Sequence, residues 1–376
     1  MWLSLIGTLA IYLLIQQFVK REWLPIFWRN GILLLAGFLI SEAVTKAGVD
    51  IGIRWFDIQE ISGSFFFPLI VINSLLELFE IRNPTSLGQA AKSVGLNIAL
   101  GLILLPAIFF FSFGYPEFYS IKTAALTALI LLASDNGMIT PFVKKKIRQF
   151  LRIESELLTT LLLIGIWIIY SWADWTDNFM HTDLLLAGFY LALIWPFSWT
   201  LCKTYEWLSP KLSKHSIWLM YVLLYGGYLI VEHFTMNGLL FTVVIAIIGK
   251  RYFGGQKHRV VKKHHQVQET IGGISMVFLG IAFTPNIFFD RWLMILLCIF
   301  IYSGFKSVLG LIITKKICSD ISVRDYLLGS IHGSSAIVLA ISIPLSFTGW
   351  YTAQAMVLGL VIFEYVVAIP LMLRAR

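Results

Sequence analysis

The amino-acid sequence predicts an all-α integral membrane protein of about thirteen transmembrane helices. Of its 376 residues, 58% are hydrophobic and 13% are charged, and the mean hydropathy is +0.81. A soluble globular domain has about one-quarter charged residues. Apolar runs of the ~20 residues needed to cross a bilayer recur from end to end. The whole chain, 1–376, is therefore expected to form a single transmembrane domain.

The predicted spans follow the apolar runs in order. The first run lacks a basic leader and a small-residue cleavage site, and its positive charges, Lys20 and Arg21, come after it. It is therefore expected to stay as an uncleaved span. The expected spans are 2–18, 30–48, 64–81, 93–114, 121–143, 153–172, 183–203, 216–234, 237–250, 268–285, 291–314, 325–347 and 351–373.

The positive charges between these spans predict the orientation. If the first residue faces outward, the odd-numbered loops and the C-terminus carry 24 of the 29 Lys and Arg residues. This division follows the positive-inside rule, and adding or removing one helix would scramble it. We expect a multi-pass protein of a bacterial inner membrane, with the N-terminus outside and the C-terminus cytoplasmic. The net charge of +8 thus reflects orientation and not a nucleic-acid partner.

Thirteen helices can divide into two inverted six-helix repeats joined by a linker helix. The division would place the first repeat at 1–172, the linker at 183–203 and the second repeat at 216–373. The odd linker makes the second half enter the membrane from the opposite face, as inverted repeats require. The sequence itself shows no obvious self-similarity at this spacing, so the repeat follows from the helix count.

Charged side chains inside the predicted spans fall at one depth. A charge at the bilayer centre costs about 3 kcal/mol or more, and such residues normally face protein or a water-filled cavity. Asp135 precedes Lys144 by nine residues, which places it ~13 Å inside the cytoplasmic edge at ~1.5 Å per residue. Lys306 precedes Lys315 by the same number of residues, so it lies level with Asp135.

Three further spans bring polar groups to the same layer: the sixth, the twelfth and the thirteenth. Two of the five spans also interrupt their apolar pattern there with glycine, in Asp135-Asn136-Gly137 and in His332-Gly333-Ser334-Ser335. This pattern predicts two broken, crossing helices, whose freed carbonyls and helix ends can hold a cation. The candidate ion-binding and transport residues are Ser134, Asp135, Asn136, Thr159, Thr160, Lys306, His332, Ser334 and Glu364.

Several segments resemble the cation/proton antiporter superfamily, the sodium/proton exchangers and their relatives. Ala133-Ser134-Asp135 resembles the family's small residue, Thr or Ser, and ion-binding Asp, and Arg148 to Leu157 resembles its R-x-x-x-x-G-E-S-L-L run. Phe305-Lys306-Ser307-Val308-Leu309 resembles the helix whose Lys or Arg braces the ion site, and Arg324 to Gly333 resembles the second broken helix. The resemblance implies antiport of sodium or potassium ions against protons, in a homodimer, without a cofactor.

One departure concerns the second carboxylate of the family motif. The family usually follows E-S-L-L with Asn-Asp or Asp-Asp, whereas an ungapped match here gives Leu158 and Thr159. Glu364 lies at a compatible depth and is our candidate substitute, although this is not a family feature. Glu154, which precedes this position, is interpreted as a favourable charge at a helix start beside a basic loop.

The mechanism implied is competition of a proton and a cation for Asp135, with Ser134, Asn136, Thr159 and Thr160 supplying neutral oxygens. Lys306 would brace Asp135 or simply neutralise it. For His332 and Glu364 we favour the plainer interpretation, a hydrogen-bonded core histidine and a protonated glutamate that faces another helix. Each threonine can also bond a carbonyl of its own helix.

Two other functions remain open at this point. The missing second carboxylate favours a family member that has lost exchange and acts as a membrane sensor or as a subunit of a larger complex. In a cation channel, Asp135 would tune selectivity without obligatory protonation. An enzyme is not expected, because the exposed segments contain no nucleophile with a base, no metal-ligand cluster and no phosphate loop. The cysteines, Cys202, Cys298 and Cys318, are expected to be packing residues.

Overall fold

The structure is a computed structural model, and the elements below come from the part of the chain that it describes. The described residues are 10, 12–17, 29–46, 84–114, 121–133, 147, 149–155, 157–159, 161–162, 165, 182–212, 216–233, 238–252, 270, 272–278, 280–281, 290–341, 343 and 349–374.

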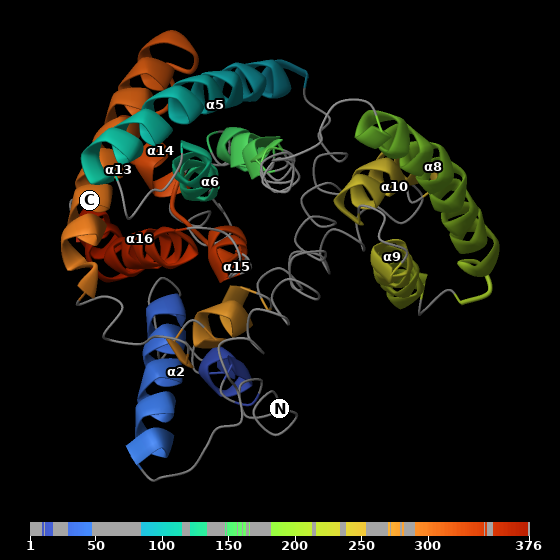
Figure 1. Cartoon of the computed structure of the whole chain (residues 1–376), viewed down its shortest axis with the longest axis horizontal. Coiled ribbons are helices and arrows are strands. Elements are labelled where there is room, and N and C mark those ends of the chain that lie inside the picture. Colours follow the sequence, from blue (N-terminus) through green and yellow to red (C-terminus); the bar gives the residue numbers. More distant parts are fainter. Residues whose placement is uncertain are drawn as a thin grey trace.

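Within these ranges the chain is helical and forms no strand, which confirms the predicted all-α class (Figure 1). Most helix bounds agree with the predicted spans to within a few residues. The exceptions are α5, which begins nine residues before its predicted span, and α6, which ends eleven residues before the predicted end of its span. The elements are α2 (Arg29–Lys46), α5 (Pro84–Phe113), α6 (Ile121–Leu132), α8 (Thr182–Leu208), α9 (Ser216–His233), α10 (Gly238–Tyr252), α13 (Trp292–Lys316), α14 (Val323–Gly329), α15 (Ser334–Ile341), α16 (Trp350–Phe363), η5 (Glu364–Ala368) and α17 (Ile369–Arg374).

The described helices form two groups that lie apart in the view of Figure 1. We call α8, α9 and α10 the three-helix bundle; its side chains pack into their own apolar cluster, with Phe241 and Met220 fully buried. The larger group, which we call the main body, contains α2, α5, α6, α13 to α17 and η5. Its core is a single cluster to which α6, α15 and α16 contribute many fully buried residues.

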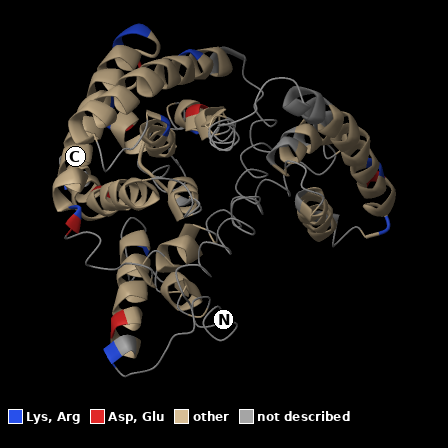
Figure 2. Cartoon of the chain, viewed as in Figure 1, with Lys and Arg blue, Asp and Glu red and all other residues tan. Residues whose placement is uncertain are grey.

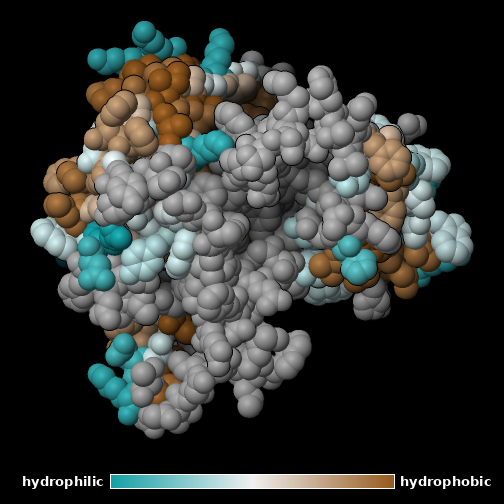
Figure 3. Space-filling view, in the orientation of Figure 1, coloured by the Kyte–Doolittle hydropathy of each residue, from teal (hydrophilic) through white to brown (hydrophobic). Residues whose placement is uncertain are grey.

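The helix surfaces are suited to a bilayer. Large apolar side chains such as Phe111 on α5, Phe300 on α13 and Val222 on α9 are 83%, 75% and 65% exposed. Figure 2 shows Lys and Arg near helix ends, and Figure 3 shows hydrophobic residues over the outside of both groups. Among the described residues, three helices are long and apolar enough to cross a membrane: Leu87–Phe113, Trp292–Lys316 and Trp350–Met372. The chain is therefore a multi-pass membrane protein.

The predicted twelfth span is broken in its middle. Here α14 ends at Gly329, residues 331–333 are not helical, and α15 begins at Ser334. The break falls at the His332-Gly333 sequence, where glycine disfavours a continuous helix. Within the fifth predicted span, α6 ends at Leu132, and the N–H of Ala133 bonds the carbonyl of Ile130 in a tighter last turn. The rest of this predicted span, 134–143, lies outside the described residues.

The thirteenth span widens into a π-helix at Glu364. The N–H of Ile369 bonds the carbonyl of Glu364 five residues earlier, and Pro370 follows directly. Proline lacks an N–H and its ring crowds the carbonyl four residues before it, which favours such a widened turn. As a result, the consecutive residues Glu364 and Tyr365 are both buried, at 8% and 5% exposed.

Candidate functional site

His332 connects the broken twelfth helix to two other helices. Its side chain is fully buried, and its Nε2 lies 2.6 Å from the carbonyl oxygen of Leu131, in the last turn of α6. Its Nδ1 lies 2.9 Å from each carboxylate oxygen of Glu364 on η5. One imidazole thus joins the end of α6, the break before α15 and the π-helix.

The backbone of the break is also satisfied by side chains of η5. The N–H of His332 donates to Oε2 of Glu364 at 2.9 Å, and the hydroxyl of Tyr365 donates to the His332 carbonyl at 3.0 Å. Asn30 on α2 in turn donates to the Tyr365 hydroxyl at 3.2 Å. Within a bilayer, irregular backbone requires such partners because no water replaces the lost helical bonds. The π-helix therefore stabilises the break.

Lys306 is a buried basic side chain that interacts with two acidic residues. Its side chain on α13 is 2% exposed, and it interacts electrostatically with Glu154 and with Glu364. Its Nζ lies 5.6 Å from the ring centroid of Tyr302, one helical turn earlier. The ammonium has no hydrogen-bond partner among the described residues.

Glu154, which also interacts with Lys306, lies in a buried polar network. Its Oε1 accepts hydrogen bonds from the hydroxyl of Ser93 on α5, at 2.6 Å, and from that of Tyr326 on α14, at 3.3 Å. Asn97 donates to the Tyr326 hydroxyl at 3.4 Å. Glu154 is 5% exposed, so the interpretation as a helix-start charge paired with a loop was wrong. Its short hydroxyl contacts supply part of the solvation that the charge loses on burial.

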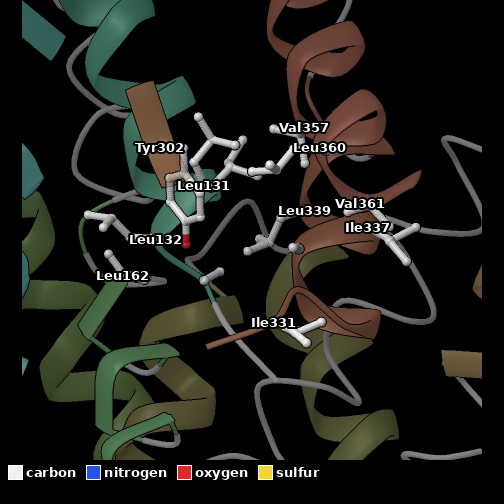
Figure 4. Packing of buried hydrophobic residues seen from close by; sticks show 14 of the residues in the cluster. Leu131, Leu132, Leu162, Tyr302, Ile331, Ile337, Leu339, Val357, Leu360 and Val361 are labelled. Carbon is white, nitrogen blue, oxygen red and sulfur yellow. The ribbon is translucent and has the colours of Figure 1, made fainter. Parts of the chain in front are cut away.

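Apolar side chains pack around this polar layer. Figure 4 shows that Leu131 and Leu132 of α6, Tyr302 of α13 and Leu339 of α15 converge on one region. The Tyr302 and His332 rings lie 5.1 Å apart. With such walls the electrostatic interactions of the buried groups are screened little, so each charge depends on its neighbours.

The structure brings together three of the predicted site residues, Lys306, His332 and Glu364, through the hydrogen bonds and electrostatic interaction above. Thr159 is buried, at 2% exposed, and Ser334 is the first residue of α15. The remaining predicted residues, Ser134, Asp135, Asn136 and Thr160, lie outside the described residues. Their roles stay predictions.

Sequence reasoning missed part of the polar layer. Ser93, Asn97, Tyr302 and Tyr326 were not singled out, although Ser93 and Asn97 are spaced four residues apart in an apolar span. That spacing puts two polar side chains on one helix face and is a signal of a buried partner. Within the described residues there is no group of three His, Cys, Asp or Glu side chains that could hold a metal ion.

Comparison with known proteins identifies the fold. No protein-family model matches the sequence, and no curated protein matches it either. Among solved structures, the chain is similar to the sodium/proton antiporter MjNhaP1 from Methanocaldococcus jannaschii, at pH 8. The TM-score is 0.64 and the sequence identity is 16%, over 96% of each chain. The chain therefore has the sodium/proton antiporter fold along almost its whole length.

Proposed function

We propose that this protein exchanges a monovalent cation, sodium or potassium, for protons by alternating access, with Asp135 as the exchanging carboxylate. The observation that carries the proposal is the buried charged layer at the junction of α6 and the α14/α15 break. His332 holds the carbonyl of Leu131, and the chain enters Ser134 and Asp135 directly after this helix end. Such an arrangement, in a chain with this fold, is what a mid-membrane ion site requires.

Lys306 supports the proposal through charge balance. Its buried ammonium has no hydrogen-bond partner among the described residues and stands in the layer at which the sequence places Asp135. A bound cation would compete with this fixed positive charge for the carboxylate, and so would a proton. The same carboxylate then serves both substrates in turn, and exchange follows without a second binding site.

The neutral ligands are assigned to the residues around Asp135. Ser134, Asn136, Thr159 and Thr160 would supply oxygens, the ligand type that hard cations prefer.

We further propose that the N-terminus faces outward and the C-terminus the cytoplasm of a bacterial cell, and that the protein forms a homodimer. A six-helix core that contains the site would rock against the remaining helices and expose the site alternately to each side.

A second candidate function is a member that has lost exchange and acts as a sensor or complex subunit. The observation that favours it concerns the position at which the family motif has its second carboxylate. In this chain Leu158 and Thr159 occupy that position, and they are buried, at 1% and 2% exposed. This position therefore contains no ionisable group. The two candidates make opposite predictions for coupled ion flux.

The test is a flux assay on purified protein in vesicles that contain a pH-sensitive dye. For an antiporter, adding sodium or potassium ions outside moves protons in the opposite direction, and Asp135→Asn abolishes this flux. Asp325→Asn is the matched control, because Asp325 lies in the first turn of α14. Wild-type protein without cation-dependent proton flux would favour the sensor, and an uncoupled current would indicate a channel. Flux that persists in Asp135→Asn would contradict the assigned carboxylate.

A further inference from the structure

We infer that His332 and Glu364 form a proton-binding site that is separate from Asp135. Its proton maintains the hydrogen-bonded contact between the α14/α15 break and the end of α6. Both side chains are buried, and neither belongs to the cation ligands assigned above. The proton site follows from the hydrogen-bond geometry alone. Its link to transport rests on the proposed function.

The hydrogen bonds fix how many protons the pair holds. The Leu131 carbonyl can only accept, so Nε2 of His332, 2.6 Å away, carries a proton. On the other side of the ring, Nδ1 lies 2.9 Å from both oxygens of Glu364. Two lone pairs at that distance would repel each other. One further proton therefore lies between Nδ1 and the carboxylate, whether as imidazolium with carboxylate or as neutral imidazole with carboxylic acid.

The groups around the pair decide what happens when this proton leaves. From α13, Lys306, Tyr302 and Cys298 interact electrostatically with Glu364. From η5, Tyr365 is a hydrogen-bond donor to the His332 carbonyl. Of these groups, Lys306 has the positive charge that can balance a Glu364 carboxylate left beside a neutral ring. The ammonium of Lys306, which also interacts with Glu154, thus lowers the free-energy cost of a Glu364 carboxylate in the deprotonated state.

Loss of the proton changes the geometry at the helix junction. Without it, Nδ1 and the carboxylate repel each other, and the contact that holds the ring in place opens. The same ring holds the carbonyl of Leu131, four residues before Asp135. Proton occupancy of the pair is therefore coupled to the position of the α6 end. If protonation of the pair changes the cation affinity of Asp135 by some factor, then by linkage a cation bound at Asp135 changes the proton affinity of the pair by that factor.

The protonation of His332 can be measured directly by nitrogen NMR. The full-length protein, with ¹⁵N-labelled histidine, is reconstituted in lipid vesicles and titrated from about pH 5 to about pH 8. The chain contains 7 histidines, and the signals missing from His332→Gln identify this ring. We expect Nε2 to stay protonated throughout, and the Nδ1 signal to change when the shared proton leaves the pair as the pH rises. A ring whose nitrogen signals do not change with pH would overturn the proposal.

Glu364→Gln separates the pair from an isolated histidine. The glutamine amide can donate to a neutral Nδ1, and its oxygen can accept the N–H of His332, so no titratable proton is needed. We expect the His332 ring to remain neutral, with its proton on Nε2, across the titration. A ring that titrates in this variant as in wild type would refute the shared site. If the variant does not fold, the wild-type titration still decides.

The same variant tests the link to transport. We expect Glu364→Gln to change the ratio of flux at low and high pH by roughly fivefold or more relative to wild type. Glu42→Gln is the control, because Glu42 lies on α2, 3.9 Å from Lys46 and partly exposed. An unchanged pH profile in Glu364→Gln would refute the coupling. Absence of flux in wild type would refute the antiport proposal, whereas the NMR titration would still report the proton site.

Discussion

The main body and the three-helix bundle differ in what they bury. In the main body, Glu154, Lys306, His332 and Glu364 are all at most 8% exposed. Among the described residues of α8 to α10, the buried polar side chains besides tyrosines are the hydroxyls of Ser198 and Thr242. Both groups are apolar outside, so the lipid environment does not cause the difference.

Part of the difference follows from helix continuity. The bundle helices α8, α9 and α10 run without a break, although α8 contains Pro196, so most of their backbone groups bond each other. In the main body, the break at residues 331–333 and the π-helix at Glu364 leave backbone groups that side chains must satisfy. Helix interruption thus accounts for the buried polar groups His332 and Glu364, whereas Lys306 lies within the uninterrupted helix α13. This comparison supports placing the proposed ion chemistry in the main body, with the bundle in a supporting role.

The largest expected effect comes from removing the buried charge of the main body. Lys306→Met keeps the side-chain volume but removes the positive charge that interacts with Glu154 and Glu364, and it should cost about 3–5 kcal/mol in unfolding free energy. Equilibrium unfolding in mixed detergent micelles measures this value. Lys203→Met in the bundle removes an exposed ion pair with Glu206 and should cost at most about 1 kcal/mol. Equal losses in both variants would remove the distinction between the two groups.

Much of the fold was predictable from the sequence because its signals are local. The predicted span 216–234 corresponds to α9 (Ser216–His233), and 30–48 corresponds to α2 (Arg29–Lys46). Apolar runs between basic loops determine such bounds directly. The break at His332-Gly333 was also predicted, since glycine and small polar residues interrupt the apolar pattern there.

The partners of the buried groups were not predictable in the same way. The distance of His332 and Glu364 from the ends of their predicted spans placed both residues in one layer of the membrane. It could not show their 2.9 Å contact, which depends on how the two spans pack. The burial of Glu154 was not predicted, because its position near the start of a predicted span suggested exposure to solvent. Its partners, Ser93 and Tyr326, come from distant parts of the chain. Pairing across 61 and 172 residues is a tertiary property.

A smaller effect is expected when a single hydroxyl is removed from each group. Ser93→Ala deletes the 2.6 Å hydrogen bond to Glu154 and should cost about 1.5–3 kcal/mol, because the acceptor is a buried carboxylate. Ser198→Ala removes a buried hydroxyl that has no hydrogen-bond partner among the described residues, so stability should be unchanged or slightly higher. The same unfolding assay compares both variants. A larger loss in Ser198→Ala would show that the bundle also depends on buried polar contacts.

The smallest effect concerns two adjacent glycines of α9, which test how tightly the bundle is packed. A Cβ at Gly226 meets nothing within 4 Å, so Gly226→Ala should gain about 0.5–1 kcal/mol from the lower backbone entropy of the unfolded chain. A Cβ at Gly227 would overlap side-chain atoms of Phe241 and Leu201, so Gly227→Ala should instead lose about 1 kcal/mol or more. Phe241 is fully buried and has little room to move. If both variants gained stability equally, the bundle would be loosely packed, and its supporting role would need another explanation.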